Sequence, residues 1–129
     1  MNPDLRHAAG IIIKDKKILL LKRSAIEEQP NKWCPVNETI KPGETPEQAA
    51  ARGVKEELGV DFQNLKFLFD NAGVDKTATV FLGDIAGEIK LDPKEVAETA
   101  WLTFEEAMKL EYAYGYDKVL ERLHEMDLL

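Results

Sequence analysis

Apolar runs separated by short polar breaks dominate the first part of the chain. Residues 7–13 and 17–23 are rich in Ile and Leu, and the intervening residues 14–16 are compatible with a turn. We therefore predict two buried strands that form a hairpin. Residues 24–31 are polar and lead to Trp33, which indicates an irregular loop after the second strand.

A helix is predicted from Pro46 to Leu58. Thr45 can cap its first turn, Pro46 suits the first helical position, and Gln48 stands where a capping box requires it. Gly59 supplies a stop signal. A narrow apolar stripe recurs at helical spacing and consists of Ala50, Val54 and Leu58. This stripe favours close packing of the helix on a sheet.

The rest of the chain predicts more strands and then helices. β-branched and aromatic residues indicate strands at 62–69, 77–85 and 99–102, with breaks at 70–73 and 92–93. A second capping box, Thr103 with Glu106, opens a short helix through Leu110. Residues 117–126 place Val119, Leu120, Leu123 and Met126 on one helical face. The order predicts one α+β domain over residues 1–129, with a mixed β-sheet between helical layers.

Composition narrows the function classes. The formal net charge of −7 argues against nonspecific binding to a nucleic-acid polymer, which depends on clustered Lys and Arg. No apolar run has membrane-spanning length, and the first ten residues lack a secretory pattern, so a cytoplasmic location and no membrane partner are expected. Cys34 is the single cysteine and has no partner at zinc-ligand spacing.

The predicted helix carries the candidate chemistry. Glu56 and Glu57 lie side by side, Arg52 is one turn back from Glu56, and Glu44 lies near the helix N-terminus, where it could brace the loop or the arginine. Paired carboxylates on a rigid helix suit Mg²⁺ and phosphoryl chemistry. A solvated, salt-bridged helix face is the simpler interpretation of such a pair taken alone. A side chain at position 53 would complete a three-pronged face, but the residue is Gly53.

The spacing of these residues resembles the signature of the Nudix (MutT-like) hydrolases. That signature is Gly, five residues, Glu, seven residues, Arg-Glu-apolar, one residue, Glu-Glu, one residue, Gly-apolar. The matching residues in this chain are Glu44, Arg52, Val54, Glu56, Glu57, Gly59 and Val60. The preceding apolar strands, Trp33, and Glu98 ahead of Trp101 extend the resemblance to most of the chain.

The resemblance implies an α/β/α sandwich that cleaves the diphosphate linkage of a nucleoside diphosphate derivative with Mg²⁺, or Mn²⁺ as an alternative. It implies that Glu56, Glu57 and Glu44 hold the metal, and that Arg52 orients the acids and contacts substrate. Glu38, on the loop that relatives place beside the metal, is a second candidate for substrate binding. Glu98 is implied as a distal catalytic acid or base; a surface charge is the other interpretation of this residue.

Two residues depart from the signature. Glu38 stands where the family has its leading glycine, and Gly53 stands where the family has the glutamate after arginine. Asn37 also replaces a glycine. One hypothesis is that Glu38 supplies the carboxylate that Gly53 lacks; the other is drift in a chain that no longer hydrolyses substrate. The second function class is therefore a Nudix-fold module that binds a nucleotide, or regulates, without cleaving it.

Other residues give weaker indications. Tyr112, Tyr114 and Tyr116 cluster where a base could stack, although aromatic residues between helices usually pack. Cys34 is similar in placement to the cysteine of Nudix-like isoprenoid diphosphate isomerases, but the surrounding motif does not match. The C-terminal helix, ending in Leu128-Leu129, is expected to be exposed and to offer a surface for a homodimer.

Overall fold

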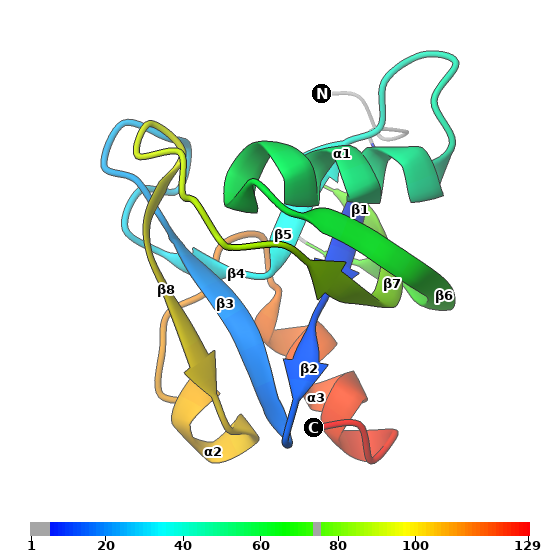
Figure 1. Ribbon diagram of the computed structural model, residues 1–129. Coiled ribbons are helices and arrows are strands. Elements are labelled where there is room, and N and C mark those ends of the chain that lie inside the picture. Colours follow the sequence, from blue (N-terminus) through cyan, green and yellow to red (C-terminus); the bar gives the residue numbers. More distant parts are fainter. Residues whose placement is uncertain (1–5, 74–75) are drawn as a thin grey trace.

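The computed structural model describes residues 6–73 and 76–129. Strands and helices follow one another along the chain as β1 (Arg6–Ile11), β2 (Ile13–Lys14), β3 (Lys17–Arg23), β4 (Trp33–Cys34), β5 (Val36–Thr39), α1 (Pro46–Leu58), β6 (Asp61–Ala72), β7 (Thr77–Ala86), β8 (Val96–Leu102), α2 (Phe104–Ala107) and α3 (Asp117–Glu125). Figure 1 shows α1 on one side of the strands and α3 on the other, so the predicted α/β/α layering and α+β class are confirmed.

The strands form two sheets. The first has the order β5-β1-β7-β6 and is mixed, because β1 runs parallel to β7 but antiparallel to β5, and β7 runs antiparallel to β6. The second is built on β3, which pairs antiparallel with β2, β4 and β8. The mixed sheet that the sequence predicts is therefore present.

Alternate residues of the central strands face opposite helices, as a period of two requires. On β1, Ala8 belongs to the apolar cluster under α1, whereas Ala9 and Ile11 belong to the cluster under α3. On β3, Leu19 and Leu21 face α1, and Ile18 and Leu20 face α3. Because both faces of these strands are buried, their sequences read as continuous apolar runs.

Helix α1 forms as its sequence predicts. The Thr45 side chain accepts a hydrogen bond from the Gln48 backbone N–H, and the Gln48 side chain accepts one from the Thr45 N–H. Gly59 ends the helix in the left-handed region, at φ 71°. The predicted stripe of Ala50, Val54 and Leu58 is fully buried against the mixed sheet. This packing fixes the direction in which the helical carboxylates point.

The predicted hairpin of residues 7–13 with 17–23 is wrong for most of its length. Only Ile13 and Lys14 pair with the following strand, and the remainder of the first run, β1, enters the other sheet beside β5 and β7. A strand that is buried on both faces has no alternation of apolar and polar residues that would indicate which strand it pairs with. Two such strands that follow each other in the sequence therefore resemble a hairpin. Strand β6 also continues through Ala72, beyond the predicted break at Asp70.

The expected exposed C-terminal helix is a second correction. Val119, Leu120 and Leu123 of α3 are fully buried in the core, and Leu129 is 6% exposed. The His124 ring stacks on Phe104 with 3.9 Å between ring centroids. Met126 is exposed and lies off the buried face, and α2 ends at Ala107 instead of Leu110. The apolar face of α3 is thus used inside the domain, so it does not supply the dimer surface that the sequence suggested.

Candidate functional site

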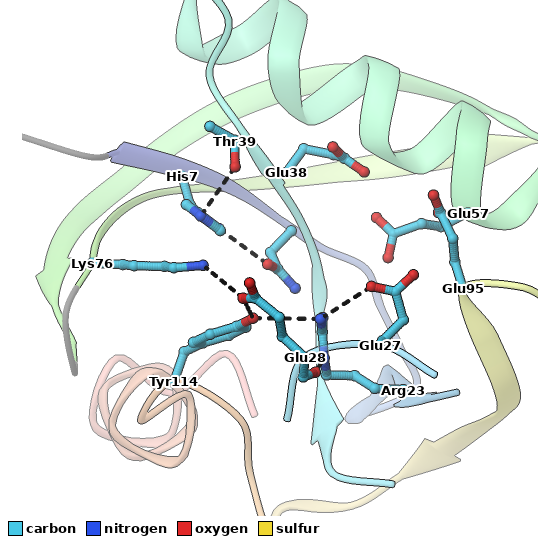
Figure 2. Close-up of a pocket in the computed structure, with 11 residues that line it drawn as sticks. His7, Arg23, Glu27, Glu28, Glu38, Thr39, Glu57, Lys76, Glu95 and Tyr114 are labelled. Carbon is cyan, nitrogen blue, oxygen red and sulfur yellow. Dashed lines mark hydrogen bonds and ion pairs between the residues drawn. The ribbon is translucent and has the colours of Figure 1, made fainter. Parts of the chain in front are cut away.

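A cavity of about 280 Å³ opens between β1, β5, the end of β3 and the C-terminal half of α1. Figure 2 shows the side chains that converge on it from these elements and from the segments around Lys76, Glu95 and Tyr114. Its lining is polar and consists of His7, Arg23, Glu27, Glu28, Asn37, Glu38, Thr39, Glu57, Lys76, Glu95 and Tyr114. We call the side lined by Glu38, Glu57 and Glu95 the acidic end, and the side where Arg23 and Lys76 pair with Glu27 and Glu28 the cationic end.

Arg52 holds the acidic end together. Its Nε and Nη2 donate to the two oxygens of Glu44 at 2.9 and 3.0 Å, and Nη2 also donates to the Thr39 carbonyl at 2.8 Å. Its Nη1 donates to Glu38 Oε2 at 3.1 Å and lies 3.4 Å from Glu56 Oε2. The guanidinium therefore ties α1 to β5 and to the loop between them, with the bidentate geometry that lysine lacks.

Glu44 braces this arginine, which is one of the two roles that its position predicted. The Arg52 hydrogen bonds and the Lys41 backbone N–H lower the pKa of Glu44 to about 2. Arg52 donates hydrogen bonds to both carboxylate oxygens of Glu44, so Glu44 links the loop before α1 to this arginine. Glu44 is also absent from the cavity lining, so its predicted role as a metal ligand remains a prediction.

Glu57 is the buried acid of the site. The residue is 6% exposed, and its Oε2 has no hydrogen-bond partner among the residues that the structure describes. Burial, followed by the negative charges of Glu38 and Glu95, raises the pKa of Glu57 well above its usual value. An unpartnered buried carboxylate oxygen is costly, and functional sites are where such costs are tolerated. Glu57 therefore makes this cavity the candidate ligand site among the residues that the structure describes.

Glu38 occupies the space beside Gly53. A Cβ atom at position 53 would lie 2.5 Å from Glu38 Cγ, far inside normal contact distance, and 3.3 Å from Glu38 Cβ, which is slightly too close. Glu38 lies on β5 and lines the cavity, and its side chain is 20% exposed. Glu38 and Gly53, the two residues that depart from the family signature, are therefore in direct contact, although one lies on β5 and the other on α1.

At the cationic end of the cavity, Arg23 pairs with Glu27 at 3.6 Å and Lys76 pairs with Glu28 at 3.9 Å, beside the Tyr114 ring. The Lys76 ammonium lies 4.0 Å from the centroid of the Tyr114 ring, and the Arg23 guanidinium lies 5.2 Å from it. The Tyr114 hydroxyl donates to Glu28 Oε2 at 3.0 Å, and that carboxylate is exposed. Of the three tyrosines in the predicted cluster, Tyr114 lines the cavity, whereas Tyr112 donates to the Ala107 carbonyl and Tyr116 is buried in the core.

His7 lies in the floor of the cavity as a neutral ring. Its Nδ1 is 3.2 Å from Asn37 Oδ1, and its Nε2 is 3.3 Å from Thr39 Oγ1. Burial and the positive charge of Lys76 lower the pKa of His7 to about 4. Both ring nitrogens are engaged, so His7 positions β1 against β5 and is not available as a base in this geometry.

Cys34 is a buried thiol that does not line the cavity. It is 1% exposed, and burial together with the negative charge of Glu57 raises the pKa of its thiol to about 12. A reactive cysteine needs an accessible thiolate. These properties weigh against the isomerase-like interpretation of this residue.

The structure brings some predicted site residues to the cavity and leaves others away from it. Glu57 and Glu38 line it, and Arg52 contacts Glu38. Glu56 is exposed beside Arg52 at the edge of the acidic end, where its charge raises the pKa of both Glu38 and Glu57. Glu98 does not line the cavity and lies 3.8 Å from the Lys22 ammonium.

Three acids of the cavity were not predicted from the sequence, namely Glu27, Glu28 and Glu95, and Glu95 is the one at the acidic end. It precedes β8, lines the cavity, and its pKa is raised by burial and by the charge of Glu38. The sequence places Glu95 and Glu98 in one acidic segment but does not indicate which of the two faces inward. The fold distinguishes them: Glu95 lies just before Val96, the first residue of β8 to pair with β3, and it lines the cavity, whereas Glu98 lies within β8 and does not.

The donor chemistry of the acidic end fits a hard divalent cation. No group of three or more His, Cys, Asp or Glu side chains in residues 6–73 and 76–129 is already arranged around one ion position. Mg²⁺, however, usually takes one or two carboxylates and fills its remaining positions with waters and substrate phosphates. The unpartnered Glu57 Oε2 and the adjacent carboxylates of Glu38 and Glu95 provide oxygen ligands of that kind.

A family model for the NUDIX domain matches residues 4–123. The chain belongs to the Nudix family. Within it, NAD-capped RNA hydrolase NudC of Citrobacter koseri is 36% identical over 70 residues, and that match covers 52% of this chain but 27% of the relative. NudC of Salmonella agona matches to the same extent. The chain therefore spans about a quarter of the length of these curated relatives, and the matched quarter supports only the Nudix assignment.

Solved structures support the same fold. A MutT NUDIX hydrolase from Burkholderia pseudomallei superimposes with a TM-score of 0.84 at 21% identity, covering 93% of this chain and 98% of that one. The NUDIX domain of Shewanella oneidensis NrtR, solved with ADP ribose, gives 0.79 at 14% identity, covering 98% and 90%. Among the described residues of this Nudix chain, no helix is long and apolar enough to cross a membrane.

Proposed function

We propose that this chain is a Nudix hydrolase that cleaves the diphosphate linkage of a nucleoside diphosphate derivative with the help of Mg²⁺ or Mn²⁺. The observation that carries the proposal is the buried, unpartnered Glu57 Oε2, which lines a polar cavity in a chain of a hydrolase family. A domain whose only task was structural would gain stability by pairing or replacing such an oxygen. An ion or a water bound there would satisfy it.

The residues divide the work by position. Glu57 and Glu38 line the acidic end, Glu56 lies at its edge, and Arg52 fixes the relative positions of Glu38 and Glu56. Glu95 contributes further negative charge to the acidic end. A divalent ion bound by these oxygens would neutralise the diphosphate and lower the pKa of an attacking water. Glu98 and Glu44 stay candidates for supporting roles, with Glu44 acting through Arg52.

The cationic end suits the rest of the substrate. Arg23 and Lys76 lie beside the Tyr114 ring, which can receive the edge or face of a base. They pair with Glu27 and Glu28, so a phosphate oxygen would bind these cations by sharing them with the carboxylates. The solved NUDIX domain of NrtR holds ADP ribose, a nucleoside diphosphate joined to a sugar. NudC, the curated relative, is named as a hydrolase of NAD-capped RNA. Both names favour a substrate with two phosphates between two organic groups.

The second candidate function is a module that binds a nucleotide, and regulates through it, without hydrolysis. Gly53 favours this function, because the helix lacks the carboxylate that the family signature has after arginine. The module would retain the cationic end of the cavity and lose turnover. It differs from the enzyme in one measurable respect, since it binds the same ligands but leaves them intact.

The test is a turnover screen of the purified protein against a panel that includes ADP-ribose, NAD, dinucleoside polyphosphates and nucleoside triphosphates, with Mg²⁺ or Mn²⁺. Products are separated by ion-exchange chromatography. We expect turnover of at least one diphosphate-linked compound, and a loss of about 10²-fold or more in kcat for Glu57→Gln. Glu88→Gln, which changes an exposed acid outside the cavity, is the matched control.

Two outcomes distinguish the candidate functions. Binding of a panel compound, measured by calorimetry, without any cleavage would replace the enzyme by the binding module. Equal turnover by the natural protein and by Glu57→Gln would show that Glu57 has no part in catalysis.

A further inference from the structure

We propose that Glu38, on strand β5, supplies a metal-binding carboxylate to this cavity. In the family signature the corresponding carboxylate belongs to the helical residue at position 53, which is Gly53 in this chain. The proposal rests on the proposed function, because it assigns a working acid to the same cavity. It makes Glu38 a metal-binding catalytic residue and Gly53 the residue that makes room for it.

A side chain at position 53 would clash with Glu38 in its observed conformation. Any side chain at 53 begins with a Cβ that would sit 2.5 Å from Glu38 Cγ and 3.3 Å from Val36 Cγ1. The space beside α1 therefore holds one side chain, and in this chain it comes from the strand. A glycine inside a helix is destabilising relative to alanine. At position 53 the glycine stands where an alanine Cβ would lie within 3 Å of Glu38 Cγ.

The carboxylate of Glu38 points toward the same region as that of Glu57. Both acids line the cavity, and Figure 2 shows Glu38 on β5 facing the side of α1 that carries Glu57. The buried Glu57 Oε2 has no partner in the described part of the chain, which is independent evidence that a ligand belongs between these acids.

Arg52 orients the Glu38 carboxylate. Its Nη1 donates to Glu38 Oε2 at 3.1 Å, and the two side chains are each 20% exposed. The same guanidinium carries Glu44 on its other edge and Glu56 one turn along the helix. The arginine is thus shared between a strand acid and a helix acid, and it sets their separation. Drift alone would not require Glu38 to be anchored in this way.

Mn²⁺ binding and turnover, measured on one set of variants, test the proposal. The set comprises the natural protein, Glu38→Gln, Glu38→Gly, the exchange variant Glu38→Gly/Gly53→Glu, and the control Glu88→Gln. Electron paramagnetic resonance of free Mn²⁺ gives the dissociation constant without any substrate. Turnover is followed on the best substrate of the panel, and circular dichroism verifies that each variant is folded.

We expect Glu38→Gln, which keeps the size of the side chain, to weaken Mn²⁺ binding about 10-fold or more and to lower kcat about 10²-fold. Glu38→Gly should lose as much. The exchange variant should regain most of both properties, because the carboxylate returns to the same space from the helix. Glu88→Gln should match the natural protein.

Three results would overturn the proposal. They are unchanged Mn²⁺ binding in Glu38→Gln, an exchange variant no better than Glu38→Gly, and no Mn²⁺ binding by the natural protein. Failure of the proposed function looks different, because a protein that cleaves nothing can still show the Mn²⁺ binding pattern across the variants. In that case the carboxylate position is established for a binding module instead of an enzyme.

Discussion

Replacing Gly53 by Ala should destabilise the protein, although alanine is the better helix former. In an exposed helix interior this change stabilises by about 1 kcal/mol. At position 53 the new Cβ meets Glu38 Cγ at 2.5 Å, and the Glu38 side chain cannot move without loosening its 3.1 Å contact with Arg52. Forcing a methyl group into a filled space costs about 1–3 kcal/mol. The balance is a net loss of about 1 kcal/mol in the free energy of unfolding.

The same substitution should stabilise the protein when Glu38 is first replaced by Ala. Cγ of residue 38 is then gone, and the closest remaining neighbours of the new methyl group lie at 3.3 Å, so a small adjustment suffices. We expect a gain of about 0.5–1 kcal/mol from helix propensity. The change of sign corresponds to a coupling of about 2 kcal/mol between the two positions, within the range of residues in contact.

Urea unfolding in EDTA, followed by circular dichroism at 222 nm, measures the four corners of this cycle without any metal or substrate. A parallel cycle of Gly53→Ala with Glu88→Ala provides the control, since that pair should be additive within about 0.5 kcal/mol. Equal stabilisation by Gly53→Ala in both backgrounds would refute the steric reasoning. The argument for a shared space between β5 and α1 would then fail with it.

Three further predictions concern the surroundings of the site. The pKa of His7 is about 4 in the folded protein, so as pH falls the unfolded chain takes up the proton first and stability should be lost between about pH 6.5 and 4. His7→Gln should flatten this part of a plot of urea midpoint against pH. An unchanged slope in His7→Gln would contradict the prediction. Arg52→Lys should lower the free energy of unfolding by about 1–2 kcal/mol, because lysine cannot reproduce the two parallel hydrogen bonds to Glu44; a midpoint equal to that of the natural protein would refute this role. Cys34 should react with a thiol reagent such as DTNB at the rate of unfolding and not at the rate of a free thiol, since it is 1% exposed; fast labelling of native protein would show that the core opens there.

Local signals predicted local structure well. The capping residues Thr45 and Gln48, the stop at Gly59 and the apolar stripe act within a few residues of one another, and α1 begins and ends at the predicted residues. The capping box of Thr103 and Glu106 is also present, although α2 is shorter than expected. Capping fixes where a helix starts, whereas its length depends on what the following residues pack against.

Non-local pairing was less accessible from the sequence. The parallel partner of β1 is β7, which lies far along the chain. A strand buried on both faces contains no alternation that would select this partner over the next apolar run. The contact between Glu38 and Gly53 was open to hypothesis because the two departures from the signature are reciprocal. Its geometry required the packing of α1 on β5. Arg23, Lys76 and Tyr114 meet only through the fold, so no spacing along the chain identified them as neighbours.

The shared space of Glu38 and Gly53 bears on how signatures of this kind are interpreted. A signature scored one position at a time counts two defects in this chain, because it treats each letter as independent of the others. In three dimensions the two changes are one exchange: the glutamate side chain is at position 38 instead of position 53, and the glycine is at position 53 instead of position 38. Scoring the two positions as a pair would class such chains with the intact members, and protein engineers who rewrite either position would have to rewrite both.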